Sequence, residues 1–233
     1  MDTFNSFLLF APVLLFSMVA HEYAHGWVAY RNGDPTAYQL GRLTWNPARH
    51  IDPFMTVLLP LFLFMAHSPV IIGGAKPVPV NPRNYRHYKR ADIMVSLAGV
   101  TTNVILAFIS AALIPAVFGL AAIIPSARDA LSLLQRMLVY GIQFNVLLAA
   151  FNLIPIPPLD GSHVFKYALP PALALSYARI SRFGILILYG LLFFAGPVVM
   201  LWFRPAFALA DGLLSSVQRF ILPASARLIA GGA

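Results

Sequence analysis

The stretch FNSFLLFAPVLLFSMVAHEYAHGWVAY, residues 4–30, joins a run of apolar side chains directly to a group of ionisable ones. The run from Phe4 to Ala20 carries no charge, and about 20 apolar residues suffice for a helix to span a bilayer. Neither the basic start nor the small-residue cleavage site of a signal peptide is present. We therefore interpret the stretch as a retained transmembrane helix that leads into His21, Glu22 and His25.

The rest of the sequence also favours lipid as its surroundings. Hydrophobic residues make up 59% of the chain and charged residues 10%, whereas a soluble globular domain carries about 25% charge. Further apolar runs cover residues 93–124, 133–154 and 184–203. The net charge of +8 comes from basic residues between these runs, which is typical of cytoplasmic loops rather than of a nucleic-acid-binding surface. The chain has no cysteine, so disulfides and thiolate metal ligands are excluded.

These runs predict an all-α polytopic membrane protein with about five or six transmembrane or re-entrant helices. We expect one domain over residues 1–233. Its core helices should cover about residues 4–30, 91–124 and 133–154, and its C-terminal helices about 180–222. The second core helix should be broken or kinked near Pro115.

Two shorter regions are expected at the membrane surface. Ile51 to Ala66 is apolar but contains two prolines, which favours a short or re-entrant helix. Tyr38 to Thr44 and Val70 to Val80 are candidates for a short strand or hairpin. Alternating prolines would confine any strand in the second segment to a sheet edge. Such an edge could pair with an extended segment of another chain.

The basic loops also predict the orientation of the chain. The loops over residues 31–49 and 76–90 should both be cytoplasmic, so the first helix ends on that side. The next two long helices cross outward and back, which returns the chain to the cytoplasmic side after Ile154. His21, His25 and the segment from Asn152 to Gly161 are therefore expected at similar depth.

His21-Glu22-Tyr23-Ala24-His25 has the HExxH pattern of a metal site. Residues four apart share one face of a helix, so both imidazoles can reach one ion. Glu22 could accept a proton from a water bound to Zn²⁺, because the ion lowers the pKa of that water to about 7. A polar surface run is the alternative interpretation. It is less favoured at the end of an apolar span, where ionisable groups are costly and usually functional.

A third ligand must come from elsewhere, since a catalytic zinc site usually has three protein ligands. Glu22 is the only glutamate in the chain, and Arg31 stands where a metzincin would have its third histidine. Asp160 is the first candidate, because it follows a helix that ends at the expected depth and Gly161 permits a turn there. An N-cap for a helix near residue 162 is the other interpretation of Asp160. His163 is the second candidate for the ligand. His67, at the end of an apolar segment, could be a ligand or a solvated side chain, while His50 and His87 are expected to be solvated.

Three segments together resemble the site-2 protease family of intramembrane zinc metalloproteases. They are residues 21–26 (HEYAHG), residues 99–103 (GVTTN) and residues 152–161 (NLIPIPPLDG). Val100 replaces a proline that is frequent in the second segment, and Leu153 delays the first proline of the third. The chain is similar to the short, minimal branch without PDZ or CBS domains.

The resemblance implies one catalytic Zn²⁺ held by His21, His25 and Asp160, with Glu22 as the general base. It implies that Asn152 lies near the ion, where its amide could stabilise an oxyanion. Asn103 would contact substrate or pack between core helices. The reaction would be hydrolysis of peptide bonds in or near transmembrane segments of membrane-protein substrates, as in regulated intramembrane proteolysis. The expected location is the bacterial cell membrane, with the active site toward the cytoplasm.

A zinc-binding membrane protein without protease activity is the rival interpretation. A transporter would need further ionisable residues along a pathway through the bilayer, and the sequence offers few. A pseudoprotease adaptor would be expected to have lost Glu22, which is present.

Overall fold

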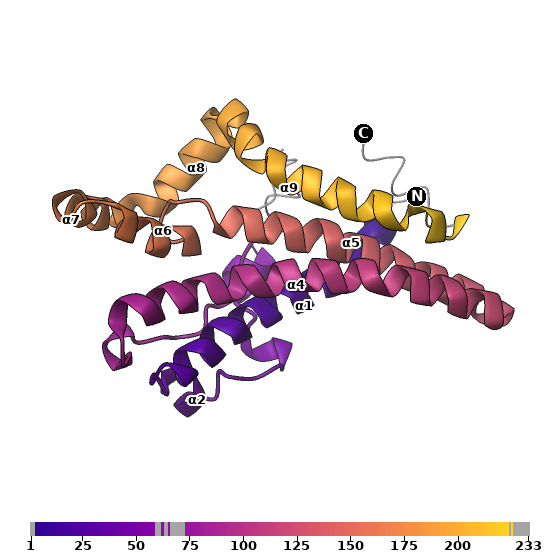
Figure 1. Cartoon of the computed structure of the whole chain (residues 1–233), viewed down its shortest axis with the longest axis horizontal. Coiled ribbons are helices and arrows are strands. Elements are labelled where there is room, and N and C mark those ends of the chain that lie inside the picture. Colours follow the sequence, from indigo (N-terminus) through magenta and orange to yellow (C-terminus); the bar gives the residue numbers. More distant parts are fainter. Residues whose placement is uncertain (1–2, 59–61, 63–64, 66–72, 224, 226–233) are drawn as a thin grey trace. The chain divides into compact units, whose positions relative to one another are not determined.

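The computed structural model describes residues 3–58, 62, 65, 73–223 and 225, and the described part is helical (Figure 1). The longer helices are α1 (Thr3–Arg31), α4 (Tyr88–Ile123), α5 (Arg128–Asn152), α7 (Pro171–Ile180), α8 (Gly184–Phe194) and α9 (Gly196–Val217). The short elements are α2 (Thr36–Gln39), η1 (Pro47–Arg49), η2 (Pro53–Leu58), η3 (Pro82–Asn84), η4 (Pro125–Ala127), α6 (Asp160–Phe165), η5 (Lys166–Ala168), η6 (Ser181–Phe183) and η7 (Gln218–Phe220).

Five helices in the described residues are long and apolar enough to cross a membrane. They cover residues 8–31, 88–123, 125–152, 171–194 and 196–220. The three core helices thus form within a few residues of their predicted bounds. Five of the eleven residues of α8 are exposed, among them Leu186 and Phe194 with exposed fractions of 69% and 91%. Such apolar exposure is what a lipid-facing helix requires.

The sequence predicts that prolines disturb the long helix at Pro115 and the short apolar segment from Ile51 to Ala66, and the outcomes differ. α4 continues through Pro115 to Ile123 without interruption. Membrane helices tolerate an internal proline where neighbouring groups satisfy the freed backbone. Pro53 begins a π-helical turn that ends at Leu58. Most of the remaining re-entrant segment, up to Ala66, lies outside the described residues.

The predicted strand at Tyr38 to Thr44 is wrong, because its first residues belong to helix α2. The Asp34 carboxylate accepts a hydrogen bond from the Thr36 amide, which begins the helical turn. The turn ends in a Schellman motif, with the Arg42 amide bonded to Ala37 O and Gly41 at φ +62°. These local hydrogen bonds favour a helical turn over a strand at this position.

The second predicted strand is also not observed in its described part. Residues 73–81 form a chain without helix or strand, and residues 70–72 lie outside the described part. Pro77 and Pro79 have no N–H to donate to a ladder. The amide of Val78, between them, donates to a side chain of α1 instead.

The first compact unit comprises residues 1–17, 103–154 and 183–233. Its core is formed by small and branched apolar residues of three helices, Ala107, Ala111, Ile114, Val139, Ile142, Val146, Ala210, Leu214 and Val217. α5 and α9 run side by side in this unit (Figure 1). Small residues let helix backbones approach closely, which favours packing within a bilayer.

Buried amides add polar links between the helices of this first unit. Asn103 donates to Asn145 Oδ1 at 2.8 Å, and Asn145 donates to Ser17 Oγ at 2.9 Å. Gln135 bonds to Phe220 O and to the Leu222 amide. Each link satisfies a polar side chain that is at most 2% exposed.

The second compact unit comprises residues 18–102 and 155–182. Its apolar core is small and consists of Ala29, Tyr85, Ala91 and Val95. Short elements and loops make up much of this unit, and polar contacts between distant segments hold it together. Within the described residues, the one group of side chains placed to hold a metal ion, His21, His25 and Asp160, belongs to this unit.

Candidate metal centre

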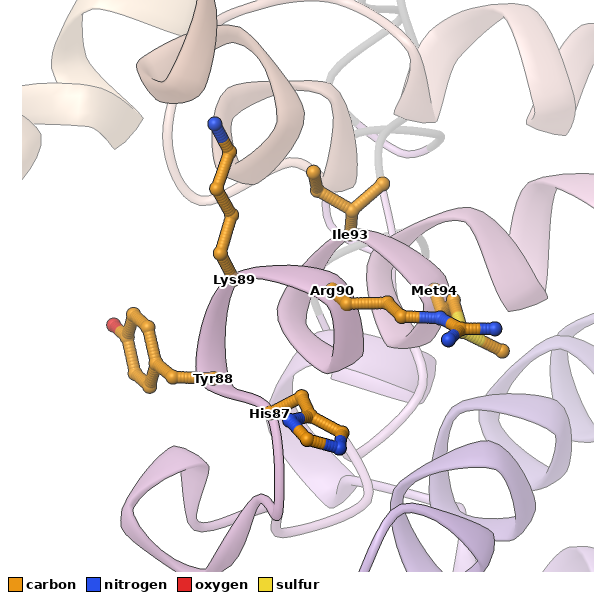
Figure 2. Close-up of a pocket in the computed structure, with 6 residues that line it drawn as sticks. All are labelled: His87, Tyr88, Lys89, Arg90, Ile93 and Met94. Carbon is orange, nitrogen blue, oxygen red and sulfur yellow. The ribbon is translucent and has the colours of Figure 1, made fainter.

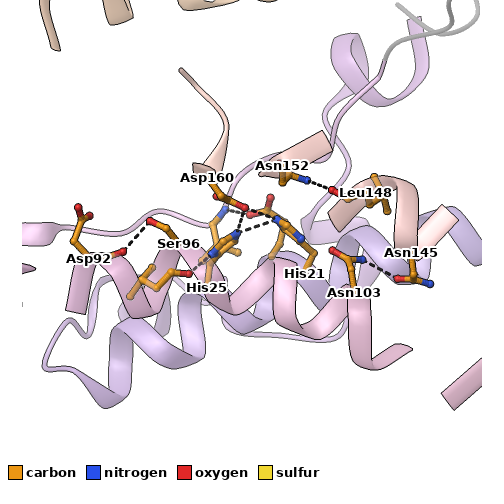
Figure 3. Close-up of polar contacts among 12 residues, drawn as sticks. His21, His25, Asp92, Ser96, Asn103, Asn145, Leu148, Asn152 and Asp160 are labelled. Carbon is orange, nitrogen blue, oxygen red and sulfur yellow. Dashed lines mark hydrogen bonds and ion pairs between the residues drawn. The ribbon is translucent and has the colours of Figure 1, made fainter. Parts of the chain in front are cut away.

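His21 and His25 lie one turn apart on α1 and face each other. Their Nε2 atoms are 2.9 Å apart, as expected of residues four apart on a helix (Figure 3). Exposed fractions of 7% and 9% show that both imidazoles are buried. Two potential ligand atoms are therefore already directed at one point.

Asp160 brings the third potential ligand atom to the same point. Its Oδ2 lies 3.2 Å from His21 Nε2 and 3.3 Å from His25 Nε2. Neither contact has hydrogen-bond geometry, so this buried oxygen has no hydrogen-bond partner among the described residues. The N-cap interpretation is not supported, because Asp160 is the first residue of α6 and the N-cap position is Leu159.

The three atoms suit a small tetrahedral ion. They all lie within 4.8 Å of one another. Two ligands about 2.0–2.1 Å from Zn²⁺ in tetrahedral geometry lie about 3.3 Å apart, close to both histidine–aspartate separations. Two imidazoles and one carboxylate are a ligand set found in catalytic zinc sites. The cluster could therefore bind one zinc ion.

α4 supports both histidines from one side. His25 Nδ1 lies 2.7 Å from Val95 O, and a proton on Nδ1 would leave Nε2 as the metal-binding nitrogen. Gly99 packs against the His21 ring so closely that an added Cβ would lie 2.5 Å from Nε2. A larger residue at position 99 would displace the imidazole.

Glu22 lies next to the cluster and is held by residues 76–81, which form neither helix nor strand and which we call the proline segment. Its Oε2 accepts a 2.7 Å hydrogen bond from the Val78 amide. An added Cβ on Gly26 would lie 2.9 Å from Val78 Cγ1, so the proline segment packs directly against α1. This contact orients the only glutamate of the chain.

Asp34 fixes the other end of the proline segment. It is fully buried and accepts hydrogen bonds from the Asn81 amide at 2.6 Å and from Asn84 Nδ2 at 2.8 Å. Burial alone would raise the pKa of Asp34, but the hydrogen bonds from Thr36, Asn81 and Asn84 hold it below its usual value. Asp34 therefore stays ionised and keeps the segment in place.

The other histidines do not join the cluster in the described structure. His163 Nδ1 lies 3.5 Å from Asp92 Oδ1, so the second candidate ligand contacts a different carboxylate. The prediction that His50 is solvated is wrong, because it is fully buried and its Nε2 contacts Thr44 O at 2.9 Å. His87 is exposed, as predicted. His67 lies outside the described residues.

The two asparagines with predicted functional roles both form hydrogen bonds within the protein. Asn152 Nδ2 donates to Leu148 O of its own helix at 3.0 Å (Figure 3). Asn103 is fully buried and bonded to Asn145. Their predicted roles stay predictions.

A surface hollow at the start of α4 is a poor candidate for a catalytic site. It is lined by His87, Tyr88, Lys89, Arg90, Ile93 and Met94. Figure 2 shows that these side chains point in different directions, so they present no convergent polar groups. None of the three potential metal ligands lines it.

Comparison with known proteins agrees with this chemistry. The model of peptidase family M50 matches residues 9–131 and 115–195. YwhC of Bacillus subtilis is 35% identical over 193 residues, which cover 81% of this chain and 82% of that protein. Rip2 of Mycolicibacterium smegmatis is 30% identical over 198 residues, which cover 84% of this chain and 70% of that protein. Each of these two relatives is named a "putative zinc metalloprotease". No solved structure matches the chain.

The matches and the apolar helices define a multi-pass integral membrane protein with the activity of a zinc-dependent metalloprotease. The chain belongs to peptidase family M50, the site-2 protease family, so the resemblance seen in its sequence is confirmed.

Proposed function

We propose that this metalloprotease hydrolyses peptide bonds in or near transmembrane segments of membrane-protein substrates, in regulated intramembrane proteolysis. The main support is the convergence of His21, His25 and Asp160 within 4.8 Å, with Glu22 as the neighbour of His21. The two histidines lie on a helix that can span the bilayer. A site carried by such a helix is suited to substrates that are themselves embedded in lipid.

Each residue of the centre has a proposed role. His21, His25 and Asp160 hold one Zn²⁺, which supplies Lewis-acid polarisation and lowers the pKa of water when bound. Glu22 accepts a proton from the attacking water and delivers it to the leaving amine nitrogen. The Val78 amide keeps the Glu22 carboxylate oriented during both transfers. Transmembrane helices protect their amides by internal hydrogen bonds, so the substrate must unwind locally.

The asparagines are proposed to have supporting roles. Asn152 could donate its amide to the developing oxyanion, for which it would have to leave its hydrogen bond with Leu148. The complete burial of Asn103 and its bond to Asn145 favour a packing role over direct substrate contact.

We further propose that the active site faces the cytoplasm of a bacterial cell. The basic residues of the loops over 31–49 and 76–90 support this orientation. Relatives in Bacillus and Mycolicibacterium agree with a bacterial membrane. α1 and α4 each contribute to both compact units, which supports treating residues 1–233 as one domain.

The direct test is cleavage by the wild type and by Glu22→Gln in detergent with zinc. A panel of single-span membrane proteins with terminal epitope tags would serve as probes, with products separated on gels. We expect cleavage of at least one member by the wild type and a loss of about 100-fold or more in Glu22→Gln, because general acid–base catalysis contributes about 10²–10⁴-fold. Asp129→Asn, an exposed aspartate of α5, is the control. Equal product from wild type and Glu22→Gln would contradict the proposal.

The rival function, a zinc transporter or pseudoprotease adaptor, makes a different prediction. Glu22→Gln would then leave function unchanged, because a group that only lines a zinc site needs no proton transfer. Family membership and the intact Glu22 favour the protease.

A further inference from the structure

One face of α4 supports the whole candidate metal centre. Asp92, Val95 and Gly99 are spaced by three and four residues, which places them on the same side of the helix. Val95 O contacts His25, and Gly99 packs against His21. The remaining member, Asp92, faces the segment that carries Asp160.

Three side chains of that segment contact the Asp92 carboxylate. Its Oδ2 accepts from Lys166 Nζ at 2.6 Å and from Tyr167 Oη at 2.9 Å. Its Oδ1 lies 3.5 Å from His163 Nδ1. All three partners follow Asp160 within seven residues along α6 and η5. One carboxylate thus ties both short elements to α4.

The chemistry of this contact suits an anchor. Asp92 is only 3% exposed, and removing one partner of a buried ion pair is strongly destabilising. Burial and the nearby Asp92 carboxylate raise the pKa of the Tyr167 phenol, so the phenol remains a hydrogen-bond donor. Lys166 also lies over the Tyr167 ring, 4.9 Å from its centroid. The anchor therefore has a charged, a hydrogen-bonding and an aromatic component.

Apart from its link to Asp92, α6 contacts another long helix through Phe165, whose ring packs edge-on against Tyr177 of α7 with the ring centroids 5.7 Å apart. It contains six residues, and its N-cap Leu159 provides no capping side chain. Prolines 155, 157 and 158 precede it and supply no amide hydrogens. Asp92 is the carboxylate that His163, Lys166 and Tyr167 share. Without this carboxylate, α6 could rotate and move the Asp160 oxygen away from the two imidazoles.

We propose that Asp92 is a positioning residue that sets the metal affinity of the centre by holding Asp160 in place. The inference rests on the proposed role of Asp160 as the third metal ligand. Asp92 itself does not contact the ion or the reacting atoms. It acts through Lys166 and Tyr167.

Metal binding by the full-length protein in detergent tests this role independently of proteolysis. Zinc affinity would be measured by competition with a chromophoric chelator, and geometry by the visible d–d absorption of the Co²⁺-substituted protein. For Asp92→Asn we expect about 10- to 100-fold weaker zinc binding, the usual effect of losing an outer-shell partner, together with an altered Co²⁺ spectrum. Asp129→Asn is the matched control and should bind both metals as the wild type does.

Two further variants keep the test decisive. Tyr167→Phe removes one donor but keeps the ring, so it should weaken zinc binding by only a few-fold, about 1 kcal/mol for one hydrogen bond. It serves as the measurement if Asp92→Asn does not fold. Asp160→Ala is measured in parallel, and wild-type zinc affinity in that variant would overturn the ligand assignment itself. The Asp92 proposal alone would be overturned by the following result. Asp160→Ala loses metal, while Asp92→Asn and Tyr167→Phe both keep the zinc affinity and Co²⁺ spectrum of the wild type.

Discussion

The two halves of α4 belong to different compact units and are built differently. The first half, residues 88–102, places Asp92, Val95 and Gly99 against the segments that carry the candidate metal ligands. The second half, residues 103–123, packs Ala107, Ala111 and other apolar residues into a helical core. The first half of this continuous helix therefore supports the candidate metal centre, and the second half packs in the apolar core. Substitutions in the first half should change metal binding, whereas those in the second half should change only stability.

The two glycines of this helix give the sharpest form of the comparison. A Cβ at position 99 would overlap the His21 ring, whereas a Cβ at position 119 has no atom within 4 Å. Gly99→Ala should reduce cleavage by about 100-fold, the effect of moving a catalytic group by about 1 Å, and should lose zinc. Gly119→Ala should retain both properties. Zinc content and cleavage rate measured in the pair check this, and equal zinc content would remove the distinction between the halves.

A smaller effect is expected where the proline segment touches α1. Gly26→Ala would press its methyl group against Val78 Cγ1, which lies at the end of a side chain that can yield. We expect a loss of about tenfold in cleavage rate, equivalent to about 1.4 kcal/mol. The double variant Gly26→Ala/Val78→Ala removes the clash and keeps the Val78 amide, so it should recover most of the activity. If the second substitution brings no recovery, the close packing is not the cause.

The helical core offers the complementary prediction. Asn145→Ala removes the links to Asn103 and Ser17, and polar contacts between membrane helices contribute about 0.6–1.7 kcal/mol. Thermal unfolding in detergent should shift to lower temperature by a few degrees, while zinc per chain stays unchanged. A loss of zinc would show that the second half of α4 also controls the metal centre.

The smallest effect concerns pH. The pKa of Asp34 is lowered in the folded protein, so its stabilising contribution is complete above the unfolded pKa and is lost as the pH falls through the folded value. The difference in unfolding temperature between wild type and Asp34→Asn should therefore shrink as the pH falls from 7 to below about 4. A difference that is constant over this range would mean that the charge of Asp34 does not stabilise the proline segment.

The sequence predicts the long helices well, because each is a long apolar run with few competing signals. It also brings Asp160 toward His25, since the charge of the loops constrains which segments lie at the same depth. The predicted strand at residues 38–44 is wrong because the Asp34 carboxylate and the positive φ of Gly41 favour a helical turn. No local pattern could reveal the burial of His50.

For a similar reason, the sequence alone does not predict the contacts that Asp92 makes. In the sequence, Asp92 is a charge near a helix end, and its partners lie more than 70 residues away. Its spacing of seven residues from Gly99 was the available signal, since that distance returns to the same helix face. The spacing is informative only once Gly99 is known to contact a ligand. The Val95 carbonyl offered no signal, because every residue has one.

The most direct test of the proposed centre is the zinc content of the purified protein, measured by mass spectrometry in the wild type, Glu22→Gln and Asp160→Ala. We predict one zinc per chain in the wild type and in Glu22→Gln, because Glu22 is assigned to proton transfer. Asp160→Ala should retain less than about a tenth of that amount after dialysis, since the site would keep only two protein ligands. One zinc per chain in Asp160→Ala, held as tightly as in the wild type, would contradict the proposed centre.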